Sequence, residues 1–103
     1  MNRIFVIINV LVTISVTNVV SAADESRSFI LASHCMSCHG PNGKSPGVVP
    51  SINAKEGSYL KKKMYAFRNG LEESTIMNRL AKGYTEEEID IITEYFAEIS
   101  RKE

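Results

Sequence analysis

The residues best suited to chemistry in this 103-residue chain are two cysteines and a histidine. They lie in the run Cys35-Met36-Ser37-Cys38-His39, and the chain has no other cysteine. Two thiols at this spacing can form a redox-active dithiol, supply half of a zinc site, or bond covalently to a haem. The spacing of the thiols alone leaves these three kinds of site open.

The histidine that directly follows the second cysteine favours the haem. Each thiol can add to one vinyl group of the same haem, and the next residue then lies beneath the iron. We therefore expect Cys35 and Cys38 to form thioether bonds to one haem c, with His39 as an axial iron ligand.

The rival sites fit the sequence less well. A zinc site needs four ligands, and His34 directly precedes Cys35, so a tetrahedral site built from this segment would be badly strained. We expect His34 to be an exposed residue at a helix end instead. A thioredoxin-like dithiol should follow a strand in an α/β pattern, and no strand pattern is visible.

A methionine is the expected ligand on the opposite side of the iron, because a thioether stabilises ferrous iron. Met1 falls in the N-terminal segment and Met36 lies inside the attachment run, which leaves Met64 and Met77. Met64 belongs to an apolar helical stripe and is typical of core filling. We therefore expect Met77 to be the second axial ligand. If Met77 were unbound, the open position would suit a haem enzyme or a gas sensor.

The elements that position these residues are all predicted to be helices. The patterns predict a helix over 24–35, a loop rich in Gly, Pro, Asn and Ser over 40–57, a helix over 58–69 and a short segment over 71–83. Ser58 is expected to cap the second helix, and Gly70 to follow its end in the left-handed conformation.

The last helix has the clearest pattern. Thr85 and Glu88 form a capping box, in which each side chain bonds the backbone of the other. An apolar stripe follows at helical spacing and comprises Ile89, Ile92, Phe96 and Ile99, flanked by Ile91 and Tyr95. With no β-pattern and no internal repeat, the predicted fold class is all-α.

The N-terminal segment has the pattern of an export signal. A basic start precedes an uncharged apolar run over 4–20, which ends in small residues. We expect a signal peptide over 1–22, cleaved after Ala22 or, as the second choice, after Ala23. One domain over 23–103 would then remain in the periplasm, with no membrane span. An uncleaved anchor is the alternative, although polar residues dilute the run.

The charge balance excludes one class of partner. Twelve basic and twelve acidic residues give no net charge, and removal of Arg3 with the signal leaves about −1. A nucleic-acid binder would show a strong basic excess. A domain this small is also marginal without a staple or cofactor, which a covalently bound haem would supply.

These residues together resemble class I cytochromes c across the expected mature chain. The resemblance implies short helices wrapped around one covalently bound haem, with the first and last helices crossing beside it. Leu31 and Tyr95 fall at the matching positions of those two helices. It also implies that the carbonyl group of Pro50 accepts a hydrogen bond from His39, which would fix the histidine ring.

A narrower resemblance is to the cytochrome subunit of flavocytochrome c sulfide dehydrogenase. It is visible in the segments 38–45, 67–70 and 74–84, most specifically in Thr75-Ile76-Met77 and Ala81-Lys82-Gly83-Tyr84. It implies an electron-transfer protein, not itself an enzyme, which receives electrons from a periplasmic flavoprotein that oxidises sulfide. The alternative is a free cytochrome that shuttles electrons between respiratory or sulfur-oxidation complexes.

Overall fold

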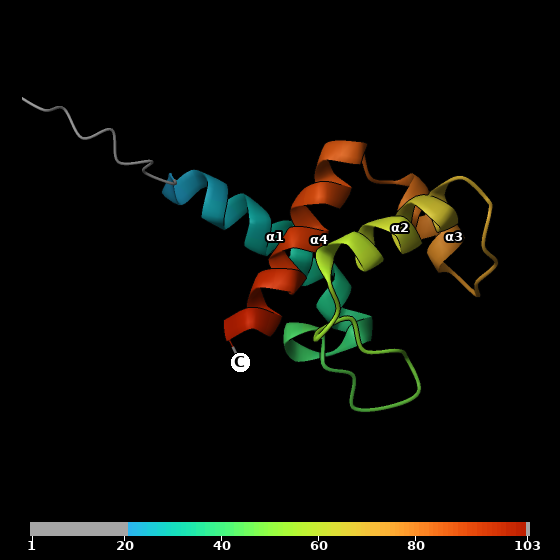
Figure 1. Ribbon diagram of the computed structural model, residues 1–103, viewed down its shortest axis with the longest axis horizontal. Coiled ribbons are helices and arrows are strands. Elements are labelled where there is room, and N and C mark those ends of the chain that lie inside the picture. The colour runs from blue at the N-terminus through green and yellow to red at the C-terminus, as the bar shows by residue number, and fades with distance from the viewer. Residues whose placement is uncertain (1–20, 103) are drawn as a thin grey trace, which may run out of the picture.

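The computed structural model describes residues 21–102, and the regular elements of this part are helical (Figure 1). They are α1 (Ala22–His39), a 3-10 turn η1 (Pro41–Gly43), α2 (Gly57–Arg68), α3 (Met77–Lys82) and α4 (Glu86–Lys102). The predicted all-α class is confirmed. The predicted signal peptide over 1–22 lies almost entirely outside the described residues.

Helix α1 is longer than predicted at both ends. It begins at Ala22 after Ser21, whose side chain accepts a hydrogen bond from the Asp24 backbone N–H at 3.4 Å. It then continues past Cys35, because no glycine or proline interrupts the chain until Gly40. Both thiols and the histidine therefore lie on the last turns of one helix.

Gly40 ends α1 in a conformation that other residues rarely adopt. Its φ is +88°, and a Cβ atom at this position would lie 1.9 Å from the carbonyl oxygen of Lys44. A side chain here would need the following turn to move, so glycine allows the chain to reverse directly after His39.

The predicted start of α2 is wrong. The helix begins at Gly57, with Glu56 in the N-cap position and no side-chain hydrogen bond to the first turn. Ser58 lies two residues after the N-cap position, too late to act as the cap, and is exposed. Propensity alone does not fix where the backbone leaves the extended conformation.

The end of α2 agrees with the prediction. Gly70 has a φ of +71°. Its N–H donates to the Phe67 carbonyl at 3.3 Å, and the Leu71 N–H donates to the Ala66 carbonyl at 2.8 Å. This pair of bonds is a Schellman motif, which satisfies carbonyl groups left unpaired at the helix end.

The capping box of α4 is confirmed. The Glu88 N–H donates to Thr85 Oγ1 at 3.1 Å, and the Thr85 N–H donates to Glu88 Oε1 at 3.3 Å. Such a cap typically stabilises a helix by about 1 kcal/mol. The predicted apolar stripe faces inward, with Ile89, Ile92 and Phe96 buried.

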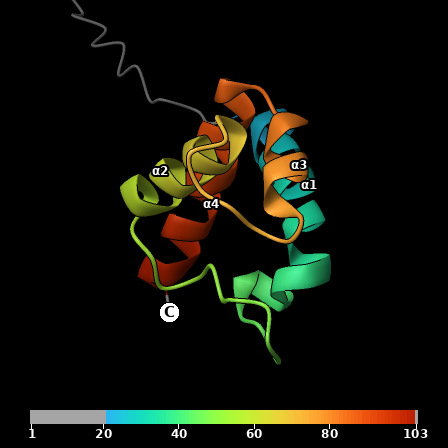
Figure 2. The same ribbon diagram turned by 90° about the vertical axis from the view of Figure 1, so that its right-hand side faces the viewer.

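The core lies where α4 packs against α1 and α2 (Figures 1 and 2). Its buried members are Ala32, Leu60, Ile92 and Phe96, with Leu31 and Tyr95 among the half-buried residues packed against them. Ala32 is fully buried on α1, and its small side chain lets the two long helices approach closely. Helix α3 packs mainly against α2.

Within residues 21–102, no helix combines the length and apolar character that crossing a membrane requires.

Candidate functional site

The thiols of Cys35 and Cys38 lie at the C-terminal end of α1 and are not joined in a disulfide. Cys35 is half-buried against the core, whereas Cys38 is exposed. Burial raises the pKa of the Cys35 thiol to about 11, and the neighbouring Cys38 adds to this rise. A redox dithiol needs a low thiol pKa, so this environment does not favour dithiol chemistry.

A zinc site is not supported either. Across residues 21–102, no three His, Cys, Asp or Glu side chains cluster closely enough to hold a metal ion. His34 is exposed, as predicted, and its Nδ1 lies 3.3 Å from the Tyr84 hydroxyl. This contact ties α1 to the turn between α3 and α4. No local sequence pattern could predict this contact, because the two residues are 50 positions apart.

The half-buried ring of His39 is held by the loop that follows it. Its Nδ1 lies 2.5 Å from the carbonyl oxygen of Pro50. Since a carbonyl oxygen can only accept, Nδ1 carries the proton, and the neutral ring keeps an unshared electron pair on Nε2. The hydrogen bond therefore sets both the tautomer and the direction in which His39 can bind a metal.

Gly43 shapes the loop that places Pro50 beneath this ring. The carbonyl oxygen of Gly43 accepts hydrogen bonds from the backbone N–H groups of Ile52, at 2.9 Å, and Asn53, at 3.2 Å. A Cβ atom on Gly43 would lie 3.0 Å from a ring carbon of Phe96 and 2.9 Å from the Ile52 side chain. The loop can thus fold back tightly onto α4 only with glycine at this position.

Met77 lies on a different element, as the first residue of α3, and is half-buried. Apolar side chains close to the site residues in sequence are exposed. Val48 is fully exposed, Ile76 is 54% exposed and Leu80 is 44% exposed. Leu80 follows Met77 by three residues, so the two side chains share a face of α3. A large apolar group bound between the two elements would cover such surface.

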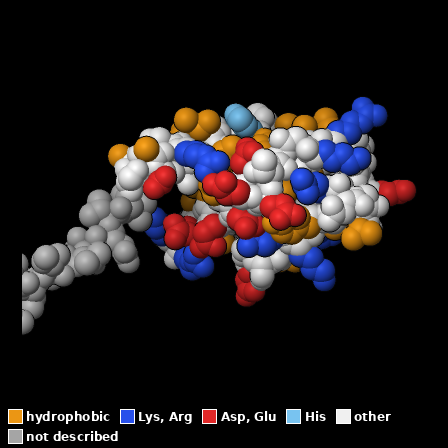
Figure 3. All heavy atoms as spheres, turned by 90° about the horizontal axis from the view of Figure 1, so that it is seen from above, with side chains coloured by type: hydrophobic (Ala, Val, Ile, Leu, Met, Phe, Trp, Pro, Cys, Tyr) orange, Lys and Arg blue, Asp and Glu red, His pale blue; other side chains and the backbone are white. Residues whose placement is uncertain are grey.

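The space-filling view separates apolar and charged surface. In Figure 3, hydrophobic side chains are exposed along one edge of the face, and acidic side chains gather near its centre. Several acids are paired with bases: Arg27 with Glu87 at 2.9 Å, Lys61 with Asp90 at 3.3 Å and Arg101 with Glu94 at 2.7 Å. These are exposed pairs, each worth little to stability.

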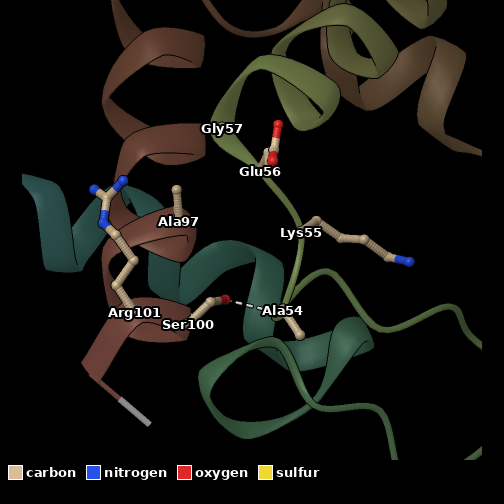
Figure 4. Close-up of a pocket in the computed structure, with 7 residues that line it drawn as sticks. All are labelled: Ala54, Lys55, Glu56, Gly57, Ala97, Ser100 and Arg101. Carbon is tan, nitrogen blue, oxygen red and sulfur yellow. Dashed lines mark hydrogen bonds between the residues drawn. The ribbon is translucent and has the colours of Figure 1, made fainter.

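A shallow pocket of about 520 Å³ lies away from these residues, between the loop before α2 and the end of α4 (Figure 4). It is lined by Ala54, Lys55, Glu56, Gly57, Ala97, Ser100 and Arg101. The Ala54 N–H donates to Ser100 Oγ across it. None of the predicted site residues lines this pocket.

Comparison with known proteins decides between the remaining readings of the two-cysteine motif. Residues 23–100 match the cytochrome c family. The chain belongs to the cytochrome c family. This cytochrome is 47% identical over 83 residues to the cytochrome subunit of sulfide dehydrogenase from Chlorobaculum tepidum, a match that covers 81% of this chain and 76% of that protein.

Two further relatives of this cytochrome are more distant. Cytochrome c-553 of Nitratidesulfovibrio vulgaris is 27% identical, with 96% of this chain and all of that protein aligned. The thiosulfate dehydrogenase electron acceptor of Stutzerimonas stutzeri is 30% identical, over 67% of this chain and 34% of that protein.

Family membership establishes the cofactor and the general activity. This cytochrome binds one haem c covalently and transfers electrons, and its helices have the class I cytochrome c fold. The residues present fit the group: two unpaired thiols, a histidine with a fixed tautomer and exposed apolar side chains close in sequence to Pro50 and Met77.

Proposed function

We propose that this cytochrome is exported to the periplasm and there accepts electrons from a sulfide-oxidising flavoprotein. The observation that carries the proposal is the 47% identity to a cytochrome subunit of sulfide dehydrogenase, most of whose length this chain covers. The export pattern over residues 1–22, with cleavage after Ala22 or Ala23, supports the periplasmic location.

Each site residue has a distinct role in this proposal. Cys35 and Cys38 would hold the haem through thioether bonds, and His39 and Met77 would bind its iron. When bound, the haem supplies a one-electron couple. The Pro50 carbonyl keeps the His39 ring from rotating and makes Nε2 more basic, as such hydrogen bonds do for metal-binding histidines.

The flavin and the haem differ in the number of electrons that each transfers. A flavin releases two electrons, whereas a chain with one attachment motif accepts one at a time. The flavoprotein must therefore pass its electrons in two events, either with onward transfer between them or to a second cytochrome. A stable complex suits such repeated transfer better than a single encounter does.

Gel filtration of a native periplasmic extract at high salt tests the partnership. We expect haem and flavin absorbance to elute together and sulfide to reduce the haem in that fraction. A stable subunit interface buries apolar surface and survives salt, whereas a transient encounter depends on charge and is weakened by it.

The isolated cytochrome is the control, and sulfide should reduce it far more slowly than it reduces the complex. If haem elutes alone at the small mass of this chain, at low as well as high salt, the chain is a free electron carrier. Reduction by sulfide no faster than that of an unrelated cytochrome would contradict the proposal in the same way.

A further inference from the structure

The side chain of Asn78, the residue after Met77, uses its full hydrogen-bonding capacity. Its Oδ1 accepts from the Ser74 backbone N–H at 2.8 Å and from Ser74 Oγ at 2.6 Å. Its Nδ2 donates to the carbonyl oxygens of Phe67, at 3.4 Å, and Glu72. Since a side-chain amide has two donors and accepts two bonds on its oxygen, each of its polar groups is satisfied.

These bonds connect three parts of the chain. Phe67 lies in the last turn of α2, where carbonyl groups lack helical partners. Glu72 and Ser74 belong to the connecting segment. The Asn78 backbone N–H also donates to Ser74 Oγ at 2.9 Å, which closes a turn around Met77. Asn78 thus links the end of α2, the connection and the start of α3.

The connecting segment has few other anchors. Every residue over 69–76 is exposed except Glu72, which is half-buried and forms an ion pair with Lys63. Its large apolar side chains, Leu71 and Ile76, point into solvent at 81% and 54% exposure. Apolar burial therefore does not hold this segment. Backbone hydrogen bonds tie its first residues, 69–72, to the end of α2, and the hydrogen bonds of Asn78 to Ser74 hold the part that leads into Met77.

We propose that Asn78 is a positioning residue that holds Met77 in place as an iron ligand. The inference rests on the proposed role of Met77 and acts through it. Without the four side-chain bonds, the segment would sample other conformations. The thioether would then occupy its binding position for less of the time, and an external ligand would compete for that position more easily.

Titration of the oxidised haem protein with imidazole tests this inference, because imidazole replaces a weakly held methionine. The readout is the sulfur-to-iron charge-transfer band. We expect Asn78→Ala to bind imidazole about tenfold or more tightly than the wild type does, since several partly buried polar groups lose their partners. Asn78→Asp, which keeps the acceptor oxygens and loses both donors, should show a smaller increase.

Arg79→Ala is the matched control, because Arg79 is the next residue on α3 and is exposed. It should bind imidazole as the wild type does. If Asn78→Ala does not yield folded protein, Asn78→Asp and Ser74→Ala carry the test, since each removes part of the same set of bonds.

The possible failures can be told apart with Met77→Ala. If that variant loses the band while the Asn78 variants bind imidazole no more tightly than the wild type, Asn78 does not position Met77 and this inference is wrong. If Met77→Ala keeps the band, the ligand assignment itself is wrong, and this inference falls with it.

Discussion

Replacement of Met77 by alanine is expected to abolish the sulfur-to-iron charge-transfer band of the oxidised protein. It should also lower the reduction potential by on the order of 0.1 V, because the ferrous state loses its soft ligand and axial ligands span about 0.8 V among haem proteins. Absorbance spectroscopy and a redox titration of the haem-loaded protein measure the two effects.

Met64→Leu is the matched control. Met64 is half-buried on α2, where a leucine of similar volume fits. The band should remain, and the loss of stability should stay under about 1.5 kcal/mol. A band that is lost in the Met64 variant and retained in the Met77 variant would reverse the assignment.

Replacement of Phe96 by alanine is expected to lower the free energy of unfolding by about 3–5 kcal/mol. Phe96 is 1% exposed, and its ring meets that of Tyr95 edge to face at 5.6 Å between centroids. The Phe96 ring also lies directly beside Gly43, where the loop that leads to Pro50 begins. Because a small domain has only about 5–15 kcal/mol in total, this loss is a large fraction of its stability.

Urea unfolding of the haem-loaded protein measures this effect, with Phe29→Ala as the comparison. Phe29 is an aromatic residue of the same size on α1, but it is 55% exposed and contacts Tyr95 only at 6.5 Å between ring centroids. Its removal should cost under about 1 kcal/mol. Similar losses for both variants would show that Phe96 does not anchor the core.

The parts of the fold that could be predicted are those with local signals. The capping box at Thr85 and the apolar stripe of α4 depend on residues within a few turns of one another, as does the left-handed Gly70. The start of α2 could not be predicted from Ser58, because the preceding loop decides where the helix begins. The burial of Ala32 in the core could not be predicted either, since alanine suits both buried and exposed helix positions.

The same division applies to the site. The run from Cys35 to His39 is a local motif, so its chemistry could be predicted directly. The role of Pro50 was predicted only from the family resemblance. Its carbonyl oxygen lies against His39 because the loop between them packs against α4. The role proposed for Asn78 could not be predicted from the sequence. Its hydrogen-bond partners are spread over 67–74 and meet only when α2, the connection and α3 come together.

Mass spectrometry of the protein purified from the periplasm tests the central claim most directly. We expect an intact mass equal to residues 23–103 plus one haem, with fragmentation placing the haem on the peptide that contains Cys35 and Cys38. A mass for residues 24–103 plus haem would only move the cleavage site to Ala23. A polypeptide mass without haem, with both thiols open to alkylation, would contradict the account.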